Sequence, residues 1–160
     1  MVPATVRELD LQFARHYHCE VLDEIPNVED RRRHFFPEAG RDGLLLRMTP
    51  RDAESWIGTF AFGAGRFSRV LSLPDPEKVC VVSRGEGYIV SARDPRAWEA
   101  LRFAPITDAR TAPAAGVVVF ANLTEMMAYG ATGVRWRTGR LAWDGLKILE
   151  VTGKSITGES

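Results

Sequence analysis

The sequence predicts one mainly β domain built from tandem antiparallel hairpins, and three observations lead to this prediction. Short runs rich in β-branched and aromatic residues recur along the chain, separated by turns that contain Gly, Pro or Asp. Strand-like runs in the second half repeat at a shift of about 38 positions, a period typical of stacked β units. Neither cysteine lies in a spacing that indicates a metal- or disulfide-based scaffold.

The composition is that of an ordinary globular domain and argues against two classes of binding partner, nucleic acids and membranes. The chain has 160 residues, of which 45% are hydrophobic and 26% charged. Its 21 basic residues balance its 21 acidic ones, so it lacks the basic surface of a dedicated nucleic-acid or anionic-membrane binder. No apolar run approaches the roughly 18 residues of a membrane span. We therefore expect no nucleic-acid partner and no membrane partner.

Residues 1–42 form the segment that is hardest to interpret. Apolar residues alternate from Leu9 to Val21 as in a strand, whereas Leu9, Phe13 and Tyr17 also suit one face of a helix. We favour a strand because the period-two pattern extends further. Residues 23–42 contain two prolines and many charges, which predicts a long irregular connection that Phe35 and Phe36 attach to the core.

Residues 43–77 read as a degenerate first copy of the repeat. Apolar runs predict strands at Leu44–Met48, Trp56–Phe62 and Arg69–Leu73. Thr49 followed by Pro50 is typical of a helix start, which predicts a short helical turn at residues 50–54. A second such turn is predicted at residues 94–100.

The repeat itself is clearest in residues 78–115 and 116–155. The shift places Val79–Ser83 on Val117–Ala121, Tyr88–Ala92 on Met126–Gly130, and Trp98 on Trp136. Within each copy, turn sequences such as Arg84-Gly85 and Asp144-Gly145 separate the strand-like runs. We predict a single domain over residues 1–160 in which these units pack together.

Part of the second copy resembles a known family of repeats. The run from Ala128 to Trp136 is similar to a shortened Ala-x-Asp-x-x-Thr-Gly-x-x-x-Trp signature of quinoprotein-type β-propeller blades, with Gly130 at the acidic position. Trp143-Asp144 resembles the Trp-Asp ending of another propeller repeat, without its Gly-His pair. Residues 40–160 are similar to uncharacterised bacterial proteins with blade-like β repeats and no assigned activity. This resemblance implies a propeller-like or partly open array, with a two-sheet β-sandwich as the alternative; it implies no quinone cofactor.

One cluster has the residue types of a metal site. On a strand, His16, His18 and Glu20 would project from one face, and two imidazoles with a carboxylate suit Zn²⁺, Fe²⁺ or Mn²⁺. The His-x-His pair resembles the first metal motif of cupins, but the acidic residue is displaced. A solvent-facing strand surface is the competing interpretation. Apart from this divalent metal, no cofactor is predicted, and Cys19 and Cys80 are expected to be small buried hydrophobes.

The sequence contains no serine-nucleophile or phosphate-loop motif. The aromatic residues are therefore the main candidates for a functional surface, and we expect that surface to bind a protein. The candidate surface consists of Met126, Tyr129, Trp136 and Trp143, and core packing is the alternative for each of them. We expect a non-catalytic bacterial β-repeat domain that binds another protein or a second copy of itself.

Two other functions stay open at this point. The first is a metal-dependent enzyme or metal-binding protein that uses His16, His18 and Glu20. The second is a small-molecule carrier with a pocket lined by Arg135, Arg137 and Arg140. The absence of a signal-like segment at the start of the sequence predicts a cytoplasmic location in a bacterium.

Overall fold

Fifteen strands arranged in stacked layers make up the described part of the computed structural model, which covers residues 9–25, 32–141, 147–151 and 156–159. The strands are β1 (Leu9–Asp10), β2 (Tyr17–Leu22), β3 (Arg33–Phe36), β4 (Gly43–Pro50), β5 (Trp56–Ala61), β6 (Arg69–Ser72), β7 (Lys78–Ser83), β8 (Glu86–Ser91), β9 (Trp98–Leu101), β10 (Asp108–Ala112), β11 (Val117–Ala121), β12 (Met126–Gly130), β13 (Gly133–Arg137), β14 (Lys147–Val151) and β15 (Ile156–Glu159). A 3₁₀ turn, η2, spans Pro113–Ala115.

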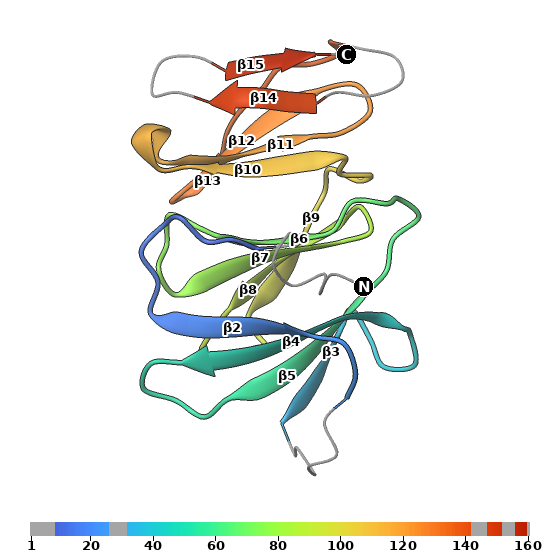
Figure 1. Ribbon diagram of the computed structural model, residues 1–160, viewed down its shortest axis with the longest axis vertical. Coiled ribbons are helices and arrows are strands. Elements are labelled where there is room, and N and C mark those ends of the chain that lie inside the picture. Colours follow the sequence, from blue (N-terminus) through green and yellow to red (C-terminus); the bar gives the residue numbers. More distant parts are fainter. Residues whose placement is uncertain (1–8, 26–31, 142–146, 152–155, 160) are drawn as a thin grey trace.

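Figure 1 shows these strands in four layers along the long axis of the molecule. The first sheet has the order β2-β4-β5-β3, and the second has the order β1-β6-β7-β8-β9. The third sheet, β10-β11-β12-β13, is an antiparallel meander, and β14 and β15 form the terminal hairpin. Most neighbouring strands are antiparallel, and the exceptions are β3 beside β5 and β1 beside β6.

Burial patterns follow the position of each strand in the stack. In β2, Tyr17, Cys19 and Val21 are buried whereas His18 and Glu20 are exposed, as expected of a strand with one face in solvent. By contrast, β7 and β11 lie in inner sheets covered on both faces, and every residue of β11 is buried. Their continuous apolar runs are therefore explained by two buried faces.

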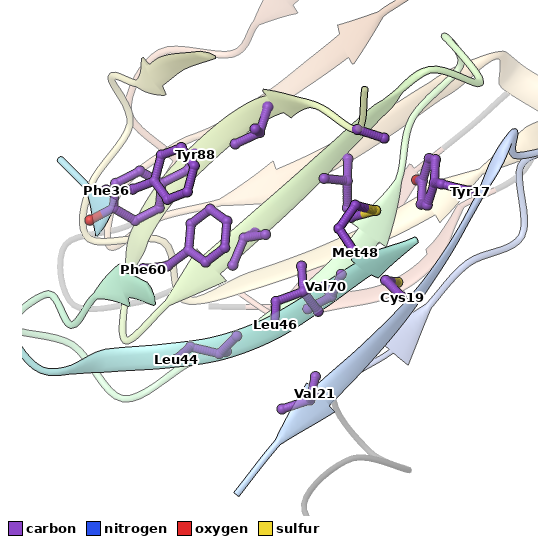
Figure 2. Packing of buried hydrophobic residues seen from close by; sticks show 14 of the residues in the cluster. Tyr17, Cys19, Val21, Phe36, Leu44, Leu46, Met48, Phe60, Val70 and Tyr88 are labelled. Atoms are coloured by element: carbon purple, nitrogen blue, oxygen red, sulfur yellow. The ribbon is translucent and has the colours of Figure 1, made fainter. Parts of the chain in front are cut away.

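Three apolar clusters fill the spaces between the layers. The first, between the first and second sheets, contains Phe60, Val70 and Tyr88 (Figure 2). Trp56 belongs to the same cluster. Side-chain hydrogen bonds cross the same boundary: Trp56 Nε1 donates to the Ala92 carbonyl at 2.7 Å, and the Tyr88 hydroxyl donates to the Ala61 carbonyl at 2.9 Å. These two sheets are thus joined by both packing and polar contacts.

The second and third sheets contact each other through equivalent positions of the two repeat copies, which are 38 residues apart in the sequence. Cys80 of β7 and its counterpart Val118 of β11 lie in the same cluster. The neighbouring positions point outward: Val81 packs towards the first sheet, and Val119 lies in the cluster that contains Ile148 of the terminal hairpin. Equivalent faces pack against each other, as in a sandwich, and the described strands do not close into a ring.

The mainly β fold and its tandem hairpins are confirmed, and most predicted strands are present within a residue or two. The strand interpretation of the N-terminal segment is correct for Tyr17–Leu22. The Asp144-Gly145 turn lies outside the described residues, and the boundaries of the repeat copies at 78–115 and 116–155 stay a prediction.

Three expectations were wrong. The predicted helical turn at residues 50–54 is absent because Pro50 and Thr49 pair with β2. Residues 98–100 of the second predicted turn belong to β9, which pairs with β8. The predicted loop at residues 23–42 contains β3, which pairs with β5 and buries Phe36. In each case pairing with a distant strand overrides the local pattern.

Among the described residues, no helix has the length and apolar character needed to cross a membrane.

Candidate functional site

The edge strand β13 carries much of the exposed apolar surface. Among the described residues, five large hydrophobic side chains are exposed, and four of them belong to residues 123–141: Leu123, Val134, Trp136 and Leu141. Val134 is 54% exposed and Trp136 is 37% exposed, and both lie in β13. Within the described structure, β13 pairs only with β12, so its outer edge has unpaired backbone groups.

The surroundings of Trp136 differ from those of its counterpart Trp98. Trp98 pairs in register with Val90, on the face of the second sheet that the first sheet covers, and its ring lies 5.6 Å from that of Phe36 in β3. Trp136 pairs in register with Ala128, on the face covered by the terminal hairpin. A four-stranded sheet covers the first face and a two-stranded hairpin the second, so Trp136 stays exposed.

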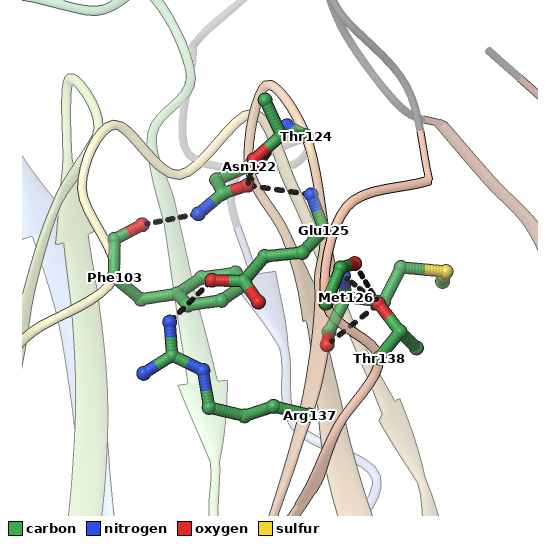
Figure 3. A network of polar contacts seen from close by, with 8 residues as sticks. Phe103, Asn122, Thr124, Glu125, Met126, Arg137 and Thr138 are labelled. Atoms are coloured by element: carbon green, nitrogen blue, oxygen red, sulfur yellow. Dashed lines mark hydrogen bonds and ion pairs between the residues drawn. The ribbon is translucent and has the colours of Figure 1, made fainter.

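A polar network fixes the end of β13 (Figure 3). Arg137 forms an ion pair with Glu125 and lies over the Phe103 ring at 5.2 Å. The Asn122 Oδ1 atom accepts hydrogen bonds from the backbone N–H of Thr124 and of Glu125. Arg135 donates to the Ala115 carbonyl at 3.2 Å. These contacts attach β13 to the turn before β12 and to the 3₁₀ turn before β11.

The predicted interaction residues have different environments. Trp136 is exposed, whereas Met126 is buried in the cluster below the terminal hairpin. Tyr129 is half-buried, and its hydroxyl donates to Glu99 Oε1 at 2.9 Å. Trp143 lies outside the described residues. Arg135 and Arg137, expected as pocket residues, are exposed and make the surface contacts given above.

The three predicted metal ligands lie in two different environments. His16 lies just before β2, and its Nδ1 atom is 2.9 Å from Glu77 Oε1. His18 and Glu20 are exposed on β2, and Glu20 is 3.7 Å from the Arg47 guanidinium. Among the described residues, no three His, Cys, Asp or Glu side chains are close enough to share a metal ion. The metal hypothesis therefore gains no support from the geometry.

A small cavity adjoins His16 instead. It has a volume of about 190 Å³ and is lined by His16, Arg51, Asp52, Glu77 and Arg93. Glu77 Oε2 is buried without a hydrogen-bond partner in the described structure. The volume is below the roughly 300 Å³ at which small-molecule pockets begin.

Two larger cavities meet at the end of the first sheet and together form what we call the Arg–Phe groove. The first opens between the first and second sheets, and the second lies on the outer face of the first sheet, where Phe35, Thr59 and Leu45 are in register. Their volumes are about 550 and 500 Å³, and both are lined by Gly43, Leu45 and Phe62. Charged and aromatic residues complete the walls: Asp23, Arg66, Phe67, Arg69 and Arg84 in the first cavity, and Arg33, Phe35, Arg41 and Asp42 in the second. No sequence motif predicts this groove, because its residues come from separate turns and strand ends.

Comparisons of the chain with protein-family models, with curated proteins and with solved structures find no match in any of the three.

Proposed function

We propose that the chain is a protein-interaction domain that accepts a β-strand of a partner polypeptide at β13, over Trp136. The observation that supports this proposal is the difference between Trp98 and Trp136. Trp98 contacts Phe36 of β3, a strand of the facing sheet, whereas no described strand takes that place above Trp136. A partner strand that pairs with the free edge of β13 would place its own side chains beside the Trp136 ring and cover it.

An edge strand supplies both parts of such an interaction. Its unpaired N–H and C=O groups bind a partner backbone, and side chains at alternate positions provide selectivity. Trp136 is a suitable anchor because tryptophan is enriched among residues that dominate binding energies. The register shift between Ala128 and Tyr129 marks a bulge, which twists the edge and disfavours indiscriminate pairing.

Charge favours an acidic partner over a second copy. Exposed Arg135, Arg137 and Arg140 lie along or just after β13, and Glu125 is already paired with Arg137. Two copies joined through β13 would bring like charges together, which opposes association. A strand with acidic side chains opposite Arg135 would not have this cost.

Site-specific photo-crosslinking tests the proposal in cells that make the protein. A photoreactive phenylalanine analogue replaces Val134, and in a control chain it replaces Arg96, an exposed residue in the turn between β8 and β9. We expect a discrete adduct from position 134 only, heavier than the 17.8 kDa chain by the mass of another protein. Its yield should fall when Trp136 is changed to Lys.

The outcomes separate the alternatives. An adduct of twice the chain mass would show that the partner is a second copy of the chain and not an acidic protein. Equal adducts from positions 134 and 96 would indicate random collision, and no adduct at 134 would rule out β13 as the contact. Circular dichroism of the Trp136→Lys variant shows whether the fold is retained.

A further inference from the structure

The Arg–Phe groove contains three arginines stacked on phenylalanine rings. The guanidinium of Arg84 lies 3.9 Å from the Phe62 ring centroid, that of Arg69 lies 4.9 Å from Phe67, and that of Arg33 lies 5.1 Å from Phe35. Stacking orients a planar guanidinium while leaving its N–H groups, which lie in the plane at its edge, able to donate to an anion. The groove therefore presents fixed donors.

The charge of the groove is positive and largely uncompensated. Five arginines line the two cavities against two aspartates, Asp23 and Asp42. Arg69 is used within the protein, since it donates to the Ala109 carbonyl at 2.7 Å and lies 3.7 Å from Asp108. By contrast, the guanidinium groups of Arg41, Arg66 and Arg84 make no hydrogen bond or ion pair with any described residue. These three groups are exposed to solvent and able to donate charge-assisted hydrogen bonds to an anion.

Arg84 occupies a backbone conformation that is unfavourable for its residue type. Its φ is +44° and that of Gly85 is +90°, in the tight turn between β7 and β8. Glycine, asparagine and aspartate are favoured in such turns. The backbone of Arg84 is held there by the Ser68 hydroxyl, which accepts from its N–H, and by Gly65, which donates to its carbonyl. The loop before β6 thus fixes an arginine at the mouth of the groove.

Unpartnered polar atoms lie in the wall of the second cavity. Arg33 Nε and Thr59 Oγ1 are both buried and lack a hydrogen-bond partner in the described structure, and both residues line this cavity. Buried polar groups without partners are rare in proteins and frequently mark a place where a ligand or water binds. The Thr59 hydroxyl is an observation independent of the charge and the stacking.

We propose that the Arg–Phe groove binds a small organic polyanion of nucleotide size, whose phosphate or carboxylate groups contact Arg84, Arg66 and Arg41. Each cavity has a volume of about 500 Å³, within the range of known small-molecule sites. The cavities meet at Gly43, Leu45 and Phe62, and the proposed ligand extends from one to the other around this end of the first sheet. The site belongs to the first and second sheets and is separate from β13.

Isothermal titration with three probes tests the proposal and identifies the anionic group. ADP carries phosphates, citrate carries carboxylates, and adenosine is the uncharged control. We expect ADP or citrate to bind with a dissociation constant well below 1 mM, and more weakly at high salt, while adenosine does not bind. Whichever of ADP and citrate binds more tightly identifies the anion. If adenosine binds as tightly as ADP, or no probe binds below 10 mM, the proposal is wrong.

A variant at position 84 localises the binding without threatening the fold. Asparagine tolerates a positive φ, so Arg84→Asn removes the guanidinium while keeping the turn. We expect affinity to fall by about tenfold or more, as for the loss of one charge-assisted hydrogen bond, with an unchanged or higher melting temperature. Arg96→Gln, in the turn before β9, is the matched control. Unchanged affinity in Arg84→Asn, or an equal loss in Arg96→Gln, would overturn the assignment.

Discussion

The carboxylate of Asp10 accepts two hydrogen bonds from Thr111, one from its backbone N–H at 2.9 Å and one from its hydroxyl at 2.6 Å. Asp10 belongs to β1 at the edge of the second sheet, and Thr111 belongs to β10 at the edge of the third. Arg69 reinforces the same boundary through the carbonyl of Ala109. The apolar interface between these sheets is therefore closed at one side by a polar clamp.

Loss of this clamp is expected to destabilise the protein measurably. Hydrogen bonds to a charged group contribute about 1.5–3 kcal/mol, so Asp10→Ala should lower the free energy of unfolding by roughly 2 kcal/mol. Urea denaturation measures the change, with the exposed Asp52→Ala as control. In a double-mutant cycle with Thr111→Val, the second substitution should cost little once Asp10 is absent. Fully additive effects would show that the two residues act separately.

Loss of the Thr59 hydroxyl, unlike loss of the Asp10 carboxylate, is expected not to lower the free energy of unfolding. The Thr59 hydroxyl is buried and has no hydrogen-bond partner in the described structure. Desolvation of an unpaired hydroxyl costs about 1–3 kcal/mol, so Thr59→Val should leave stability unchanged or raise it. Urea denaturation in ligand-free buffer checks this, with Thr111→Val as the comparison in which a paired hydroxyl is lost. A clear destabilisation by Thr59→Val would mean that the hydroxyl is hydrogen-bonded in solution.

The sequence predicts those elements whose own residues carry the signal, and it misses those that depend on distant partners. Val117–Ala121 is a continuous apolar run and forms β11 over those same residues. Asp108–Ala112 contains an Asp, an Arg and a Thr, so nothing local predicts β10, which forms because β11 pairs beside it. Residues 33–36 read as a loop for the same reason, since only β5 supplies their pairing.

The candidate sites show the same limit. The sequence left core packing and exposure both open for Trp136 and Met126; Trp136 is exposed because β13 is an edge strand, and Met126 is buried because the terminal hairpin lies above it. The spacing of His16, His18 and Glu20 predicted a shared face, yet β2 begins only at Tyr17, and Glu77, 61 positions away, holds His16. The Arg–Phe groove unites residues from 21 to 84, whose proximity exists only after the sheets have stacked.

Tyrosine ionisation gives a prediction with a defined sign. Burial, followed by the hydrogen bond to Glu99, raises the pKa of Tyr129 to about 12. Burial also raises the pKa of Tyr88 and, far more strongly, that of Tyr17. These are the chain's three tyrosines. Because each folded pKa exceeds the unfolded value of about 10, the folded state holds these protons more tightly, and this stabilisation is lost as pH rises above 10.

Absorbance titration of tyrosinate measures the effect. Native protein at pH 10.5 should show little tyrosinate, whereas protein in urea should be more than half ionised at that pH. Tyr129→Phe should remove the native transition near pH 12, and Glu99→Gln should shift that transition to lower pH because the hydrogen bond contributes to it. Native tyrosinate appearing at pH 10 would show that these hydroxyls are solvated.

The two cysteines provide separate probes of the two interfaces between sheets. Cys19 packs between the first and second sheets, and Cys80 packs between the second and third. Burial raises the pKa of Cys19 to about 11 and raises that of Cys80 further. Since the thiolate is the reactive form, neither should react with a disulfide reagent at pH 8 until its interface opens.

Asp10→Ala should therefore act selectively on thiol reactivity. The Asp10–Thr111 clamp closes only the interface that contains Cys80, so its loss should accelerate labelling of Cys80 and leave that of Cys19 unchanged. Labelling rates in the single-cysteine variants Cys19→Ala and Cys80→Ala, each with and without Asp10→Ala, measure this. Equal acceleration at both thiols would show that the layers open together, as one cooperative unit, rather than one interface at a time.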